Sequence, residues 1–128
     1  MINRPSIIYK IVPAALWQQA ISHGVFKGAP IDLSDGFIHF STAAQVRETA
    51  ARHFAGQKDL LLIHVETAQL GQALRYEVSR GGDLFPHLYA PLPLAAATRT
   101  QPLPLGDDGH HVFPDDLTRH NGACQDRS

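Results

Sequence analysis

The stretch Asp35-Gly36-Phe37-Ile38-His39-Phe40-Ser41-Thr42 decides how we expect the chain to fold. Its middle residues predict a short strand, in which alternation places Phe37 and His39 on the same face. Its last two residues begin a helix, because Thr42 and Gln45 have the spacing of a capping box. A strand that leads into a helix brings His39 near free helix N–H groups, a natural site for an anion or phosphate. A histidine that only bonds a neighbouring strand is an equally good interpretation.

The segments before this stretch predict a strand, a helix and a loop. Residues 6–12 are a β-branched and aromatic run that Pro13 ends, as expected for a buried strand. Residues 14–23 carry apolar side chains at helical spacing, and Gly24 supplies the stop. Residues 26–35 are rich in glycine, proline and aspartate, so we expect a loop there.

The segments after this stretch add one helix and several strands. The helix that starts at Ser41 has an apolar stripe that ends at His53 and Phe54. Strands are predicted at the hydrophobic run 59–66, at the alternating run 74–79 and at residues 95–101, with a loop at 91–94. Two early helices followed by several strands predict an α+β fold with a curved, split sheet that is mixed or mostly antiparallel.

Composition and charge limit the class of protein. The 128 residues are 44% apolar and 18% charged, which is typical of a soluble globular domain and excludes disorder throughout. The net charge of -1 favours neither nucleic acid nor a membrane as partner, so a small-molecule ligand is the partner we expect. Without a signal peptide or a membrane span, we expect a cytoplasmic protein with one domain over residues 1–114 and a flexible tail over residues 115–128.

The eight histidines and one cysteine do not have the spacing of a metal site. No H-E-x-x-H pair occurs, and Cys124 alone cannot build a disulfide or a cysteine-based zinc site. His110 and His111 follow Gly106 and Gly109, which place them in a predicted solvated loop. His53 is interpreted as a boundary histidine, and His64 as either buried or facing a cleft. We therefore predict no metal.

Two polar clusters have both a functional and a structural interpretation. Residues 85–89 place His87 and Tyr89 around a proline, where they could line a pocket for a planar group or form an aromatic turn that closes the core. Arg75 and Glu77 share one face of a strand, where they could bind ribose and phosphate or form a weak, solvated ion pair.

Several runs together resemble one family, a small bacterial group known as domain of unknown function 952. These runs are Ile8-Tyr9-Lys10-Ile11, Trp17-Gln18-Gln19-Ala20, residues 35–42, Gln45, and Phe85-Pro86-His87-Leu88-Tyr89. The similarity extends from about residue 6 to residue 102. The group is in turn similar to the ADP-ribosyltransferase-like superfamily, which implies a split, strongly curved α+β sheet around an NAD-binding cleft.

A closer resemblance is to the RNA 2′-phosphotransferases, which use NAD to remove a 2′-phosphate from RNA. Their first strand carries tyrosine, histidine, glycine and threonine, and a later strand carries histidine, leucine and serine. Here residues 9–12 and residues 39–41 follow in the same order. His39 therefore corresponds to the second motif histidine, and Lys10 stands where the first would be. A lysine there would contact a phosphate as a mobile point charge.

The resemblance implies a nucleotide or NAD-like ligand in a cleft between the first helix and the sheet. The implied binding residues are Tyr9, Lys10, His39, Ser41, Arg75, His87 and Tyr89, and the implied catalytic residues are His39 and Glu77. Two functions are compatible with this implication. One is an enzyme that acts at a ribosyl or phosphoribosyl group, and the other is a non-catalytic small-molecule-binding module on the same scaffold.

Overall fold

The structure is a computed structural model that describes residues 6–79, 82–114 and 117. Its α-helices are α1 (Ala14–His23), α2 (Pro30–Asp35) and α3 (Val46–His53). Its strands are β1 (Ile7–Pro13), β2 (Val25–Phe26), β3 (Ile38–His39), β4 (Leu60–Glu66), β5 (Leu74–Val78), β6 (Leu84–Leu88), β7 (Leu92–Pro93) and β8 (Ala97–Leu103). Single turns of 3₁₀ helix connect β4 to β5 and β7 to β8.

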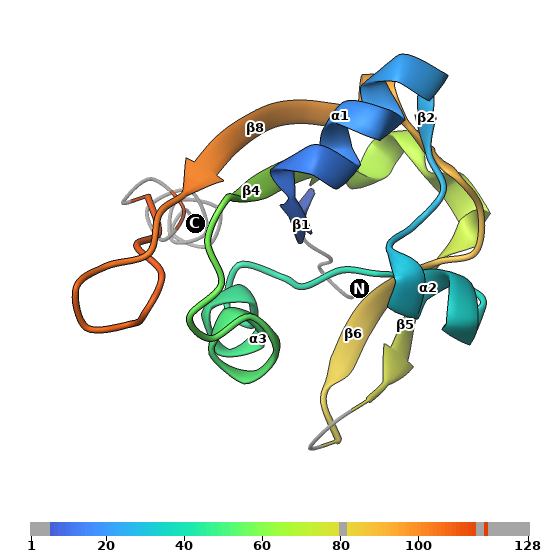
Figure 1. The fold of residues 1–128 in the computed structure, drawn as a ribbon. Coiled ribbons are helices and arrows are strands. Elements are labelled where there is room, and N and C mark those ends of the chain that lie inside the picture. Colours follow the sequence, from blue (N-terminus) through green and yellow to red (C-terminus); the bar gives the residue numbers. More distant parts are fainter. Residues whose placement is uncertain (1–5, 80–81, 115–116, 118–128) are drawn as a thin grey trace.

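The strands form three small antiparallel sheets. One has the order β1-β4-β8, another has the order β3-β6-β5, and β2 pairs with β7. Figure 1 shows the β5 and β6 strands set apart from the sheet that contains β4 and β8, with α1 lying over that sheet. The prediction of an α+β fold with antiparallel pairing is therefore confirmed, as are the strand and helix before Gly24 and the central strand near residues 59–66.

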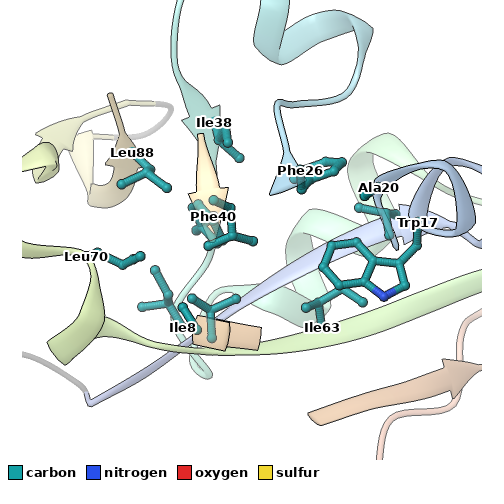
Figure 2. Packing of buried hydrophobic residues seen from close by; sticks show 13 residues of the cluster. Ile8, Trp17, Ala20, Phe26, Ile38, Phe40, Ile63, Leu70 and Leu88 are labelled. Atoms are coloured by element: carbon teal, nitrogen blue, oxygen red, sulfur yellow. The ribbon is translucent and has the colours of Figure 1, made fainter. Parts of the chain in front are cut away.

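The larger hydrophobic core lies between these sheets and fixes the orientation of β3. Ile38 and Phe40 are almost fully buried in this core, beside Ile8 and Leu88 (Figure 2). Because side chains alternate along a strand, burial of Ile38 and Phe40 turns His39 toward the opposite side. The His39 side chain therefore points away from the larger hydrophobic core.

A second core lies on the other face of β1 and is covered by α3. Tyr9 and Ile11 of β1 pack there with Val46 and Ala50 of α3, and Leu117 joins them. Burial on both faces explains why residues 6–12 read as a continuous apolar run without alternation. Lys10 interrupts that run and is only 8% exposed.

The predicted loop over residues 26–35 is wrong, because Phe26 belongs to β2 and residues 30–35 form α2. Pro30 suits the first turn of a helix, where its missing N–H has no partner to lose. The side chain of Asp32 accepts the backbone N–H of Ala29 at 2.7 Å, which satisfies one of the free donors at the helix start.

The predicted helix start at Ser41 is also wrong, since α3 begins at Val46. Ser41 instead bridges to β1, with its N–H and C=O bonded to the backbone of Tyr9 at 2.9 and 2.8 Å. Gln45 does accept the Thr42 N–H, at 3.0 Å, as one half of a capping box requires. The bridge keeps residues 38–41 extended for longer than the capping pattern predicts.

Two further expectations change near the C-terminal half. Residues 85–88 lie in β6, the central strand of its sheet, so an aromatic turn is wrong, and Leu92–Pro93 form β7 where a loop was expected. The predicted tail lies outside the described residues except for Leu117, which is 1% exposed and packed in the second core. No helix in the described part of the chain is long and apolar enough to cross a membrane.

Candidate functional site

A buried carboxylate, Asp32, holds together three parts of the chain. It is 1% exposed and accepts both contacts of the Lys10 ammonium, with Nζ at 3.1 Å from Oδ1 and 3.0 Å from Oδ2. Its Oδ1 also accepts the backbone N–H of His39 at 3.1 Å and the ring Nδ1–H of His39 at 2.6 Å. Asp32 thus ties α2 to β1 and β3 at one point.

The surroundings of Asp32 change the pKa of the carboxyl and of its lysine partner. Burial would raise the pKa of Asp32, but the His39 ring, the charge of Lys10 and two backbone N–H groups together lower it to about 2. Burial lowers the pKa of Lys10, because the ammonium loses water, and the charge and hydrogen bond of Asp32 oppose that change. The carboxylate is therefore ionised at neutral pH and compensates a cation that has little access to solvent.

His39 has a carboxylate at each ring nitrogen. Nδ1 bonds Asp32 at 2.6 Å, and Nε2 lies 3.0 Å from Oδ2 of Asp35 at the end of α2. The Nδ1 contact is a hydrogen bond to Asp32, and the Nε2 contact is a close approach to a second carboxylate. The short β3 strand and the six-residue α2 therefore fix the position and plane of this ring together.

His87 on β6 also has a carboxylate at its Nδ1. Its Nδ1 donates to Oε1 of Glu77 at 2.8 Å, and the Tyr89 hydroxyl donates to the same oxygen at 2.7 Å. The hydrogen bonds from Tyr89 and then His87 hold the pKa of Glu77 below its usual value, and Glu77 in turn raises the pKa of Tyr89. The Arg75 guanidinium lies 4.7 Å from the centre of the Tyr89 ring.

Phe37 joins the two histidines. Its ring centre lies 4.2 Å from that of His87 in a stacked arrangement and 4.6 Å from that of His39. The prediction that Phe37 and His39 share a face agrees with this contact. Phe37 thus contacts both imidazoles, stacked on His87 and tilted against His39.

A pocket of about 340 Å³ lies beside these groups. Lys10, His39 and His87 line it, and the two hydroxyls of Ser41 and Thr49, which are 2.8 Å apart, also reach it. Apolar side chains complete the wall: Ile11, Ile31, Phe40, Phe54 and Phe85. Its volume falls in the lower part of the range of ligand sites, about 300–1,000 Å³.

The pocket gathers most of the residues that the sequence singled out. Tyr9, Lys10, His39, Ser41 and His87 all line it. The other predicted site residues, Glu77, Arg75 and Tyr89, lie behind His87 and do not line it. No residue of α1 lines this pocket, which β1, α2, β3, α3 and β6 form, so it is not the expected cleft between the first helix and the sheet.

Sequence reasoning missed Asp32 and Asp35, because both were assigned to a loop. The signal that could have found Asp32 is a proline followed two residues later by an aspartate, which is typical of the first turn of a helix. Thr49 lies on α3, where nothing in the sequence marks it as a pocket residue. His53, interpreted as a boundary histidine, is exposed and lines the same pocket.

Two further histidines have hydrogen-bond partners distant in the sequence. His64 is buried, bonds Gln101 at 2.7 Å and lies edge-on to the Tyr9 ring, which decides between the two alternatives for it. His111 bonds the backbone oxygen of Gln57 at 2.8 Å. Among the residues that the structure describes, no group of three or more histidine, cysteine, aspartate or glutamate side chains could hold a metal ion.

A family model described as "Protein of unknown function (DUF952)" matches residues 11–100, well over half of the chain. The chain belongs to the DUF952 family. The match includes Asp32, His39, Glu77 and His87, and it begins one residue after Lys10.

Solved structures of one bacterial protein, CC0527 from Caulobacter crescentus, are similar to this DUF952 chain. Its crystal structure is 47% identical, covers 88% of this chain and 98% of its own, and superposes with a TM-score of 0.84. Its solution NMR structure is 48% identical, covers 83% of this chain and 91% of its own, and has a TM-score of 0.75. A search of curated proteins found no match. The comparisons therefore give this DUF952 chain a family and a solved fold, and no activity.

Proposed function

We propose that the pocket binds a nucleotide or NAD-type ligand and that the protein is an enzyme acting at a ribosyl or phosphoribosyl group of it. The observation that carries this proposal is the cluster of Lys10, Asp32 and His39. Two N–H donors from different strands, the Lys10 ammonium and the His39 ring, are anchored on one buried carboxylate, and both line a pocket of ligand size.

A fixed cluster of this kind suits a phosphate. Lys10 donates a hydrogen bond to Oδ1 of Asp32 and lies 3.0 Å from Oδ2, and an ammonium has three N–H donors, which leaves capacity for another acceptor. Donors whose positions are set before the ligand arrives lose little freedom when they bind an anion. His39 supplies a ring donor beside the ammonium, and exchange of Asp35 for a ligand anion would keep that donor bonded.

The apolar wall suits the rest of a nucleotide. Phe54 and Phe85 line the pocket together with Ile31, in addition to the polar groups of Lys10 and His39. Aromatic side chains stack on planar groups such as bases. A pocket of about 340 Å³ lies in the lower part of the range of ligand sites, so the rest of a dinucleotide would extend beyond it.

The resemblance to the ADP-ribosyltransferase-like superfamily supports the same ligand class. It implied that the positions of Lys10 and His39 both serve the ligand, and the two side chains do share one carboxylate in the fold. An ADP-ribosyltransferase-like architecture is part of this proposal, with NAD as its first candidate ligand.

One observation favours the alternative of a non-catalytic binding module. Glu77, the carboxylate expected to orient a ligand hydroxyl, already accepts hydrogen bonds from His87 and Tyr89 and does not line the pocket. A module of this kind would bind the same ligands and release no product.

A thermal-shift screen against NAD, ADP-ribose and a short 2′-phosphorylated RNA tests the proposal. A ligand at about one hundred times its dissociation constant adds about 2.7 kcal/mol to stability. We expect a shift with the wild type that disappears in His39→Asn, whose amide still donates to Asp32 but lacks the second ring nitrogen. His110→Asn, in an exposed loop, should keep the shift. Absence of a shift with every ligand, or an equal shift in His39→Asn, contradicts the proposal. Nicotinamide release from NAD then separates an NAD-cleaving enzyme from a module.

A further inference from the structure

We infer that His39 and His87 are a general acid–base pair for a ribonucleotide phosphodiester, whose own 2′-hydroxyl is the nucleophile. This inference rests on the proposed nucleotide ligand and gives that ligand a reaction. It concerns His87 as much as His39, and it assigns a role to the carboxylate behind each ring.

The two rings lie side by side on a single pair of strands. His39 on β3 and His87 on β6 are register partners, and their ring centres lie 5.5 Å apart in an edge contact at an interplanar angle of 70°. Both line the same pocket. A group bound in the pocket can therefore contact both imidazoles at one place.

Each ring has a carboxylate at its Nδ1. Nδ1 of His39 donates to Asp32 at 2.6 Å, and Nδ1 of His87 donates to Glu77 at 2.8 Å. A carboxylate at Nδ1 fixes the tautomer and leaves Nε2 as the atom that exchanges protons. One such pair is common in structural sites, but two of them at one register position beside a pocket indicate proton transfer.

The partners differ, and the difference assigns the roles. Nε2 of His39 lies 3.0 Å from Oδ2 of Asp35, so a proton on this nitrogen would face a carboxylate. Glu77 is the one carboxylate in contact with His87 within the described chain, and it contacts Nδ1. We therefore assign His39 as the acid and His87 as the base.

An imidazole pair moves protons and supplies no nucleophile. The hydroxyls of Ser41 and Thr49 in the pocket are bonded to each other at 2.8 Å. The hydroxyl beside the ester of a ribonucleotide fills this role without a further reactant. Lys10, whose ammonium has donor capacity beyond Asp32, would neutralise the charge that develops on the phosphoryl oxygens.

The proposed reaction is an intramolecular transesterification, in which phosphorus is transferred from the 5′-oxygen to the 2′-oxygen. Nε2 of His87 takes the proton of the 2′-hydroxyl, and the freed oxygen forms a bond to phosphorus. The bond from phosphorus to the 5′-oxygen breaks, its electron pair stays on that oxygen, and the oxygen takes the proton of His39 Nε2. The products are a 2′,3′-cyclic phosphate and a free 5′-hydroxyl. Asp35 gives way when the ester binds, because it is 42% exposed and such pairs contribute little.

The test uses the full chain with uridylyl-(3′→5′)-adenosine and with its 2′-deoxy analogue, which lacks the nucleophile. We expect the wild type to release adenosine from the ribose compound alone. His39→Asn and His87→Asn keep a donor to Asp32 and Glu77 and remove Nε2, so each should lower turnover by about 10²–10⁴-fold. His110→Asn, purified in the same way, should match the wild type, which also controls for a contaminating nuclease.

The pH profile separates a catalytic role from a structural one. The wild type should give a bell-shaped profile, in which His87→Asn removes the acid limb and His39→Asn the alkaline limb of the residual rate. If His87→Asn does not fold, Glu77→Gln leaves the ring in place and should lower turnover and move the acid limb.

Three results would overturn the inference. Cleavage of the 2′-deoxy analogue, or cleavage that persists in both His→Asn variants, excludes the pair as the source of activity. A thermal shift with the uncleaved deoxy analogue and no cleavage of the ribose compound overturns the pair and leaves the proposed nucleotide site intact. If neither a thermal shift nor cleavage is observed, the acid–base pair and the proposed nucleotide site are both overturned.

Discussion

At the scale of single residues, the account depends on how Asp32 compensates Lys10. Removal of one partner from a buried ion pair leaves the other charge without water or counter-ion, which typically costs about 3–5 kcal/mol. We expect Asp32→Asn, which keeps the side-chain volume, to lower the free energy of unfolding by about that amount in urea titrations. Asp35→Asn on the same helix is the matched control and should cost less than about 1 kcal/mol, because Asp35 is 42% exposed. Equal losses in the two variants would contradict the role given to Asp32.

The lowered pKa of Asp32 predicts how stability depends on pH. The carboxyl has a pKa of about 2 in the fold against an ordinary value of 3.8, so the folded state binds its proton less tightly than the unfolded state. Its contribution, about 2 kcal/mol, is complete above about pH 5 and is lost as the pH falls through 3.8 toward 2. Urea titrations of the wild type and Asp32→Asn should therefore differ less at pH 3 than at pH 7. A constant difference over that range would refute this assignment.

The site was predictable from the sequence only in part. Lys10 and His39 stand out because each polar residue interrupts an apolar strand, and alternation predicts the face that His39 takes. Asp32 was missed, because one short helical turn among glycines and prolines has the composition of a loop. The contact between His39 and His87 depends on pairing of β3 with β6, which separates them by nearly fifty residues and which no local pattern encodes.

At the scale of elements, Gly28 sets the approach to α2. Its φ of +127° suits glycine, and an added Cβ would lie 2.8 Å from Cβ of Asp32. Gly28→Ala therefore combines backbone strain with a clash against the central carboxylate, whereas Gly36→Ala at φ +89° meets nothing within 4 Å and carries strain alone. We expect Gly36→Ala to cost about 1–2 kcal/mol and Gly28→Ala at least about 1 kcal/mol more in urea titrations. Equal costs would mean that the loop before α2 moves freely away from Asp32.

Some helices and strands can be predicted from local sequence patterns, and others cannot. β1, α1 and β4 were predicted because long apolar runs or helical spacing are bounded by Pro13, Gly24 and similar stops. β6 was harder, since Pro86 lies inside a central strand and lacks the N–H that a ladder uses. The C=O of Pro86 still accepts the Phe40 N–H at 3.0 Å, so long-range pairing outweighs the local preference.

At the scale of the whole molecule, Leu117 fixes the last described part of the chain to the second core. It is 1% exposed and packs with residues of β1, β4 and β8. Leu117→Ala should lower the free energy of unfolding by about 2–5 kcal/mol, as for other buried leucines. Leu33→Ala is the control, since Leu33 is 64% exposed and its loss should change stability by about 0.5 kcal/mol or less. A small effect at both positions would contradict the packing of Leu117.

The central claim is that a nucleotide-type ligand occupies the pocket between β1, α2, α3 and β6. The most direct test is a titration of the ¹⁵N-labelled protein with ADP-ribose, followed by its amide and imidazole NMR signals. The account predicts shifts that saturate together and centre on Lys10, His39, Ser41 and His87, with the His110 signal unchanged. Shifts centred away from these residues, or none at millimolar ADP-ribose, would contradict it.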